Sequence, residues 1–487
     1  MFVPLAEWLP DLPAMNNPGS TVATNVIPYI NSYAPFASPV IYSDALTARS
    51  RGSVAVRDST GTAFNFAGDA TKLYKMASAS WADVSKVGGY TTASEEIWEY
   101  AQYGNTLIST NFTDAPQAWT LGTSTAFADL AGTPPKGRCV ATVRDFVMFG
   151  NLSDATGTDP NAVRWCAIDT PTTWTIGTSQ ADRQVLPNAG YVRKIVGGEY
   201  AVILCENSIY RATYVGTPLV FQFDEVEPNR GCVSQGSVAN IGYNIFYLSD
   251  EGFYLFNGST SIPIGANKVD KYFWADVDQS YLYRITSLLD PINKVVFWSY
   301  PGSGSSSGTP NKILAYNWQV QKWTLIEQEC ETICKSMTEG YTLETIDALI
   351  GNPDTGAYAD VSIDSRQFTG GKYIFSCFDT AHKLSNFTGS SKAATIDTAE
   401  TQLSEMARST VNNTRPMYEG SGSVSVQIGT RDTPNEAVTW SDSTSQNSEG
   451  ECNLYAEGRY HRARMTTSGE FTHLYGIEFS AKRGGRY

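Results

Sequence analysis

Residues 236–265 read GSVANIGYNIFYLSDEGFYLFNGSTSIPIG and contain one complete repeat of the fold. Four short apolar segments are separated by Gly, Asn and Asp turn signals, a pattern typical of an antiparallel meander. The two middle segments, 245–248 and 253–256, are apolar at every position. Strands of this kind are covered on both faces. A meander covered on both faces needs a similar sheet in front of it and behind it, as in a propeller blade or a stacked solenoid.

The same pattern recurs between residues 46 and 395. Its marker is an aromatic residue followed, after one position, by an aliphatic or aromatic residue at a strand end. The markers begin at Trp81 (looser), Trp119, Trp174, Phe221 and Trp323. They lie roughly 40 to 55 residues apart, with one interval about twice as long, which falls in the range of propeller repeats. We therefore predict an all-β protein with a β-propeller of six or seven blades over 46–395, and we interpret the markers as core residues.

The two ends of the chain differ from the repeat. Residues 1–45 contain seven prolines, too many for a regular element, interleaved with aromatic residues. This composition predicts an ordered, extended arm laid over a surface, with Trp8, Tyr29 and Tyr33 as candidate docking residues. Residues 396–487 contain strands that alternate on a period of two and long polar loops, which predicts a separate β-sandwich-like domain.

The last thirty residues are basic although the chain as a whole is acidic. The net charge of the 487 residues is −14. This balance argues against a general nucleic-acid binder, which neutralises phosphates with Lys and Arg. The basic end makes Arg462 and Arg464 candidates for docking onto an acidic partner, and a solvated strand face is an equally simple interpretation.

Other features concern compartment and mobility. The eight scattered cysteines are interpreted as buried free thiols of a reducing cytosol. No signal peptide is recognised at the start, and no apolar run is long enough to span a membrane.

One loop is rich in Gly and Ser. Residues 301–310, PGSGSSSGTP, are predicted to form a hairpin tip that is flexible by composition, with Gly302, Gly304 and Gly308 as a candidate mobile loop.

Catalytic patterns are weak throughout the sequence. The three histidines belong to no HExxH motif, and there is no GxSxG, P-loop or GxGxxG after a strand. An Asp-box of the sialidase type is also missing. We therefore expect no catalytic residue, cofactor or metal. One alternative is a propeller glycan hydrolase or depolymerase, which requires two carboxylates ~5–9 Å apart in a cleft. Another is an adhesin or fibre-attachment module that exposes Tyr90, Trp98 and Tyr103.

Motifs at both ends and in the middle resemble one family. The N-terminal motifs are WLPDLP (8–13), NPG (17–19), NVIP (25–28), YAP (33–35), AGD (67–69) and LY (73–74). The central and C-terminal motifs are VRDFVMF (143–149), NRGCV (229–233), GRYHRAR (458–464), GEF (469–471), GIEF (476–479) and GGR (484–486). Together they are similar to the tail hub or nozzle proteins of short-tailed phages, which are also called packaged-DNA stabilisation proteins.

The resemblance implies a structural virion protein of the phage tail, made in the host cytoplasm. Six copies would form a ring below the portal and adaptor, retain packaged DNA and conduct it during ejection. The implied partners are five further copies, the portal–adaptor connector, tail fibre, spike or needle proteins, and double-stranded DNA that passes without sequence-specific binding. Six chains of charge −14 carry −84, and an acidic lumen would let DNA slide.

Overall fold

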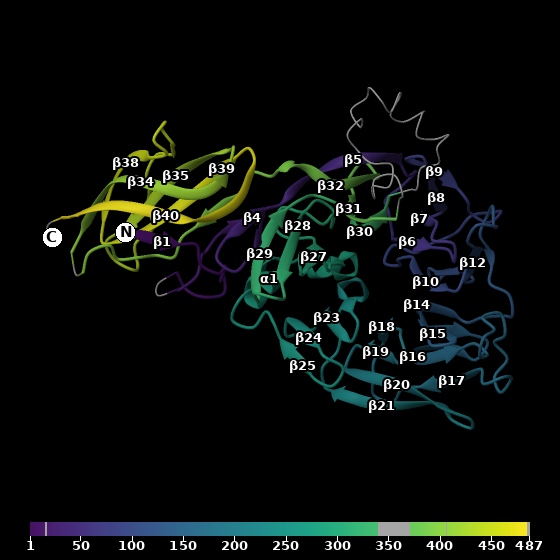
Figure 1. The fold of residues 1–487 in the computed structure, drawn as a ribbon. Coiled ribbons are helices and arrows are strands. Elements are labelled where there is room, and N and C mark those ends of the chain that lie inside the picture. The colour runs from purple at the N-terminus through teal and green to yellow at the C-terminus, as the bar shows by residue number, and fades with distance from the viewer. Residues whose placement is uncertain (15–16, 339–370, 406, 485–487) are drawn as a thin grey trace.

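A computed structural model describes residues 1–14, 17–338, 371–405 and 407–484 of the chain. Strands make up 52% of the described residues and helices 4%, as the turn-rich sequence predicts. The described residues form a β-propeller of seven four-stranded blades, joined to a β-sandwich that also holds both chain ends (Figure 1). No helix in the described ranges is long and apolar enough to cross a membrane.

Blades 1 to 3 follow one another along the chain. Blade 1 consists of β6 (Ser53–Arg57), β7 (Ala63–Gly68), β8 (Leu73–Ala77) and β9 (Ser80–Asp83). Blade 2 consists of β10 (Glu99–Tyr103), β11 (Thr106–Thr110), β12 (Gln117–Thr120) and β13 (Ala128–Asp129). Blade 3 consists of β14 (Lys136–Val143), β15 (Phe146–Asp154), β16 (Gly157–Trp165) and β17 (Asp182–Val185).

Blades 4 to 6 continue the ring. Blade 4 consists of β18 (Val192–Val196), β19 (Ala201–Cys205), β20 (Ser208–Gly216) and β21 (Val220–Pro228). Blade 5 consists of β22 (Ala239–Ile241), β23 (Asn244–Leu248), β24 (Phe253–Phe256) and β25 (Ser261–Pro263). Blade 6 consists of β26 (Thr286–Asp290), β27 (Val295–Tyr300), β28 (Lys312–Asn317) and β29 (Lys322–Glu327). Short helices flank blade 5: η1 (Gln235–Ser237) before it, and α1 (Asp270–Asp276) and η2 (Gln279–Arg284) after it.

Blade 7 closes the ring with a strand from the other end of the chain. It consists of β30 (Thr332–Met337), β31 (Tyr373–Phe378), β32 (Lys383–Ser391) and β5 (Ala37–Ala45). β5 pairs antiparallel with β32, with Ile41 opposite Ser385. Residues 37–45 therefore belong to the propeller, which corrects the sequence-based division that gave them to the arm. The outer edge of the last blade needs a partner strand, and the N-terminal segment supplies it.

The predicted repeat at residues 236–265 is blade 5. Phe246 pairs with Leu255 across β23 and β24, and Phe246 is buried at 1% exposure, as the two-sided apolar pattern predicts. Leu255 is only half-buried, because the adjacent strand β25 has three residues and leaves Ile262 exposed beside it. Four of the five aromatic markers are buried, and Trp81 is half-buried at the edge of blade 1.

The sandwich is assembled from both ends of the chain. Its six-stranded sheet contains β1 (Phe2–Pro4), β3 (Val26–Pro28), β4 (Tyr33–Pro35), β34 (Ser409–Gly420), β38 (Cys452–Gly458) and β40 (Phe471–Arg483). Its second sheet contains β2 (Ala23–Thr24), β33 (Thr395–Asp397), β35 (Ser423–Arg431), β36 (Thr439–Trp440), β37 (Thr444–Ser445) and β39 (Tyr460–Ser468). The arm is thus part of the sandwich.

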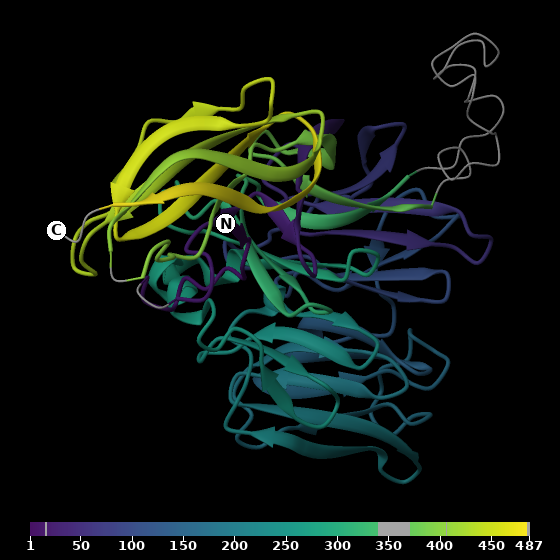
Figure 2. The ribbon, with the colours of Figure 1, turned by 60° about the vertical axis from the view of Figure 1, so that its left-hand side comes forward.

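One sheet runs without a break from the propeller into the sandwich. Thr24 of β2 pairs in parallel with Leu325 of β29 and antiparallel with Thr395 of β33, which makes blade 6 and the second sandwich sheet one ten-stranded sheet. One hydrophobic core likewise contains residues of blades 5 and 6, the arm and the sandwich. Figure 2 shows the sandwich lying against one side of the propeller. All eight cysteines are buried and unpaired.

Candidate functional site

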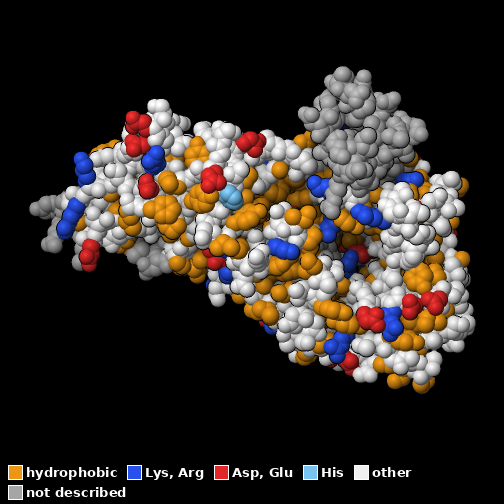
Figure 3. All heavy atoms as spheres, in the orientation of Figure 1, with side chains coloured by type: hydrophobic (Ala, Val, Ile, Leu, Met, Phe, Trp, Pro, Cys, Tyr) orange, Lys and Arg blue, Asp and Glu red, His pale blue; other side chains and the backbone are white. Residues whose placement is uncertain are grey.

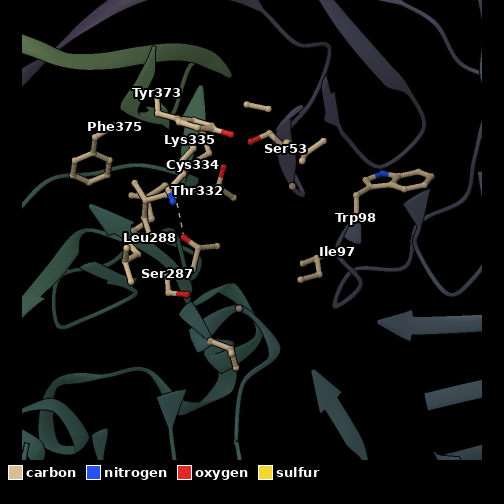
Figure 4. Close-up of a pocket in the computed structure, with 18 of the residues that line it drawn as sticks. Ser53, Ile97, Trp98, Ser287, Leu288, Thr332, Cys334, Lys335, Tyr373 and Phe375 are labelled. Atoms are coloured by element: carbon tan, nitrogen blue, oxygen red, sulfur yellow. Dashed lines mark hydrogen bonds between the residues drawn. The ribbon is translucent and has the colours of Figure 1, made fainter. Parts of the chain in front are cut away.

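A cavity lies at the centre of the propeller. Its volume is about 1030 Å³, and its walls come from the first strands of blades 1, 2, 4, 5, 6 and 7 (Figure 4). The first strands contact one another around the ring, for example β6 with β10, β26 with β30 and β30 with β6. Apolar side chains of Ile97, Trp98, Leu288 and Phe375 alternate with polar ones along the wall.

The cavity is basic in a chain that is acidic. Among the residues that the structure describes, seven cationic side chains line it: Arg49, Arg51, Arg57, Lys194, Arg284, Lys335 and Lys372. Three carboxylates line it: Glu99, Asp290 and Glu331. The formal balance is therefore +4, whereas the whole chain carries −14. Figure 3 shows Lys and Arg side chains gathered around the hollow of the propeller.

Three arginines form the first of two clusters in this cavity. Arg49 and Arg51 lie just before β6, and Arg284 lies just before β26. Burial, together with the charges of Arg284 and Arg51, lowers the pKa of Arg49 to about 10. Burial also lowers the pKa of Arg51. Like charges that act on one another in this way are destabilising, so the cluster favours a bound anion.

Backbone carbonyls hold two of these arginines, while the charges of Glu331 near Arg49 and of Asp69 and Glu96 near Arg51 act on them without a direct ion pair. Arg51 donates to the carbonyl oxygens of Thr92, at 3.1 Å, and Ala93. Arg284 donates to the carbonyl of Ser307 at 2.8 Å and lies over the rings of Tyr281 and Tyr283. Arg49 has no hydrogen bond or ion pair to any residue within the described ranges.

A second cluster lies around Tyr373, at the start of β31. The guanidinium of Arg57 lies 5.9 Å from the centroid of the Tyr373 ring, and so does the ammonium of Lys335. Arg57 also donates to the carbonyl of Gly371, and Lys372 follows directly in the chain. Arg57 ends β6 and Arg51 precedes it, so the two clusters stand some 20 Å apart along that strand, at ~3.3 Å per residue.

The carboxylates of the cavity already have partners. Glu331 accepts from the backbone N–H of Ser50 at 2.9 Å and lies 2.5 Å from His382 Nδ1; burial raises its pKa. Glu99 accepts from Lys194 Nζ at 2.5 and 2.6 Å. Asp290 accepts from the Ile292 N–H and the Asn293 side chain. None of the six other cations forms an ion pair among the described residues.

Two of the three predicted docking residues of the arm are internal. Trp8 is buried, donates to the carbonyl of Thr21 at 3.2 Å and packs edge-on against Tyr272. Tyr33 is buried and donates to the carbonyl of Ala6 at 2.7 Å, and burial raises its pKa far above its usual range. The expectation that these two rings face a partner is corrected, because they fill the junction of propeller and sandwich. Tyr29 alone lies at the surface.

The predicted basic docking residues also have internal partners. Arg464 donates to both carboxylate oxygens of Asp397, at 2.8 and 3.0 Å, and Asp397 is fully buried. Arg462 donates to Thr21 Oγ1 at 3.2 Å, and both guanidinium groups lie over the ring of Trp440. These arginines hold β39 to β33, to the N-terminal segment and to β36, and this corrects their assignment to a partner surface.

The Gly/Ser loop is fastened along its length, contrary to the expectation of a mobile loop. Gly302 N donates to Asn311 Oδ1 at 2.8 Å, and Ser303 Oγ donates to Asp276 at 2.6 Å. Gly308 packs so closely on Tyr281 that a Cβ at this position would lie 2.3 Å from the ring. Gly304 has a positive φ of 83°, a backbone conformation suited to glycine. The glycines therefore serve close packing and turn geometry.

The aromatics expected on an exposed adhesin face lie mostly inside. Tyr90 and Trp98 are buried and pack edge-on at 5.0 Å, and Tyr103 is half-buried. Sequence reasoning missed the basic cavity, although a signal exists: the stretch ARSRGSVAVR (48–57) places Arg on both sides of a first strand. Residues at the two ends of a first strand lie near the central channel, and this rule would have found the site.

Comparisons with known proteins leave the family open. No protein-family model and no curated protein matches the chain. Among solved structures, an extracellular domain assigned to a one-component system of B. thetaiotaomicron is similar at 11% identity and TM-score 0.41, over 83% of this chain and 47% of that one. YCF48 bound to a D1 peptide is similar at 12% identity and TM-score 0.33, over 61% of this chain and 87% of that one. The designed protein Ika8 is similar at 10% identity and TM-score 0.33, over 68% and 93%. This chain thus matches about half the length of the first structure, and TM-scores this low carry no functional argument.

Proposed function

We propose that this protein is a structural subunit of a phage tail, six copies of which form a hub or nozzle ring below the portal and adaptor. The proposal rests on the resemblance of its end motifs to tail hub proteins. The observation that supports it best is the continuous sheet from β26 to β36, which couples the propeller to the sandwich. A subunit that retains DNA under pressure needs its parts rigidly coupled, and a shared sheet and core provide this.

Because Trp8 and Tyr33 are buried, the candidate contact between the arm and a partner protein is now limited to the turn between β3 and β4. Tyr29 and Ile30, between β3 and β4, are exposed at 36% and 68%. Lys322 of blade 6 holds this turn by donating to the carbonyl oxygens of Tyr29 and Ile30, at 3.4 and 2.8 Å. An apolar tip on a fixed turn is suited to insertion into a connector protein. In this proposal the tip is the connector contact.

DNA would pass along the axis of the ring and not through the propeller. The cavity within each propeller is basic, whereas the remainder of the chain carries about −18, obtained from −14 for the chain and +4 for the cavity. An acidic outer surface facing the ring axis would repel phosphates and let DNA slide. Ring formation on a portal–adaptor connector is the direct test.

The glycan-hydrolase alternative is less well supported by the same geometry. Its mechanism needs one protonated and one free carboxylate facing a bound sugar. In the propeller cavity Glu99 is bound to Lys194, and Glu331 to Ser50 and His382. Turnover of a polysaccharide by the purified protein, lost in Glu331→Gln, would favour that alternative over a structural role.

A further inference from the structure

We propose that the propeller cavity is a binding site for a small organic polyanion that carries phosphate or carboxylate groups. The inference stands on the cavity alone and does not depend on the proposed tail function. Six cationic side chains face a cavity of about 1030 Å³ without an ion pair to a described residue. Arg49, Arg51, Arg284 and Lys335 are half-buried, and an unpaired charge in such a position is costly unless a ligand neutralises it.

The arrangement of the cations indicates that they bind a ligand and do not only keep the protein soluble. Arg49 has no hydrogen-bond partner among the described residues, whereas Arg51 and Arg284 are anchored by backbone carbonyls. Anchored guanidinium groups are preorganised, so less side-chain entropy is lost when an anion binds. Guanidinium groups bind carboxylate and phosphate through paired hydrogen bonds, which gives this cluster its chemical selectivity.

The shape of the cavity limits the size of the ligand. Its volume is at the upper end of the ~300–1,000 Å³ typical of small-molecule sites. Apolar lining residues, which include Leu288 and Phe375, would pack against an uncharged part of the ligand. Arg57, Lys335 and Lys372 offer a second anionic group a partner at the opposite end.

Thermal shift assays and titration calorimetry on the full chain can test the site with defined probes. The probes are pyrophosphate and citrate at about 10 mM, with chloride at matched ionic strength as reference. We expect at least one probe to raise the melting temperature by about 2 °C or more. Binding of pyrophosphate alone identifies a phosphate ligand, and binding of citrate alone identifies a carboxylate ligand.

Variants assign the effect to the cavity. Arg49→Gln and Arg284→Gln should each weaken binding about tenfold or more, since each removes a charged hydrogen-bond donor to the anion. Arg415→Gln, at an exposed position of β34, is the matched control and should bind like the wild type. Without a probe, Arg49→Gln should melt no lower than the wild type, because the substitution relieves repulsion within the cluster.

Several results would overturn the proposal. These are no response to either probe, an unchanged response in both cavity variants, or an equal loss in Arg415→Gln. Binding of an oligonucleotide in the absence of any response to pyrophosphate or citrate would also contradict it. If Arg49→Gln does not fold, Arg284→Gln in the same cluster decides the test alone, because Arg284 is only half-buried. Retention of full binding by Arg284→Gln would then count against the site.

Discussion

The hydroxyl oxygen of Ser43 accepts a 2.9 Å hydrogen bond from the indole N–H of Trp81, and this contact joins blade 7 to blade 1. The same oxygen accepts from the backbone N–H of Leu384 at 3.1 Å. Ser43 belongs to β5, the strand that the N-terminal segment contributes to the last blade. Ser43 is therefore a buried polar link between the outer strands of blades 7 and 1, while Asn65 of β7 bonds to the backbone N–H and carbonyl of Met337 nearer the channel.

Ser43→Ala should weaken this closure. The substitution leaves the Leu384 N–H and the Trp81 indole without an acceptor, at a cost of about 1–3 kcal/mol in the free energy of unfolding. Ser80→Ala is the control, since Ser80 is exposed and bonds only to Asp44. Denaturant unfolding of both variants measures the difference. Equal stabilities would show that this contact does not hold the ring closed.

Deletion of residues 1–40 should also destabilise the propeller, because residues 37–40 belong to β5, the outer strand of blade 7. The division of the chain made from the sequence, which places the propeller at 46–395, would instead leave it folded.

The ion pair of Arg464 and Asp397 should be a stability determinant. Arg464→Gln leaves a carboxylate buried with Thr21 as its remaining side-chain partner at 3.5 Å, and we expect a loss of about 3 kcal/mol. Arg415→Gln, on the exposed side of β34, should change stability by less than ~0.5 kcal/mol. Chemical denaturation of both proteins is the measurement. A neutral Arg464→Gln, combined with loss of tail incorporation, would restore the docking role expected from sequence.

Asp270 should make stability depend on pH. Burial raises the pKa of Asp270 to about 6, and the adjacent glycines, Gly252 and Gly265, leave its carboxyl little room. A folded pKa above the unfolded one gives stability that is fully present below about pH 4 and is lost as the pH rises through about 6.

Asp270→Asn isolates this dependence. The variant should match the wild type near pH 4 and exceed its stability above about pH 7, by on the order of 3 kcal/mol for a shift of about two pKa units. The amide oxygen can still accept from the Phe253 N–H, which bonds to Asp270 at 3.1 Å. Melting curves of both proteins across pH are the measurement. Parallel curves would contradict the assignment.

Tyr29→Ser with Ile30→Asp should block assembly without unfolding the chain. Both side chains are exposed at the β3–β4 turn, so their replacement removes a docking surface and little core packing. Val87→Ser, at a fully exposed apolar position, is the control and should assemble normally. Incorporation into tails and the melting temperature are measured together. Normal incorporation of the double variant would exclude this turn as the connector contact.

Much of the fold could be predicted from local patterns, and the long-range parts could not. The doubly apolar segments around Phe246 predicted stacked blades because burial on both faces leaves a direct mark on the sequence. The pairing of Ile41 with Ser385 left none, since strand partners far apart in the chain are not encoded by local periodicity. The net charge of the whole chain gave no indication of the basic cavity, because it does not show where the charges gather. Arg49 and Arg284 are distant in sequence and line the same cavity only in the folded ring.

The central claim concerns assembly, and mass photometry with negative-stain imaging tests it most directly. The purified chain should be a monomer alone, because copies of charge −14 repel one another, most strongly at low salt, where the Debye length grows to ~30 Å at 0.01 M and the charges are poorly screened. Added to a portal–adaptor connector, it should form a ring of six with an open axis. A stable monomer that never associates with the connector, or a closed assembly without an open axis, would contradict the proposal.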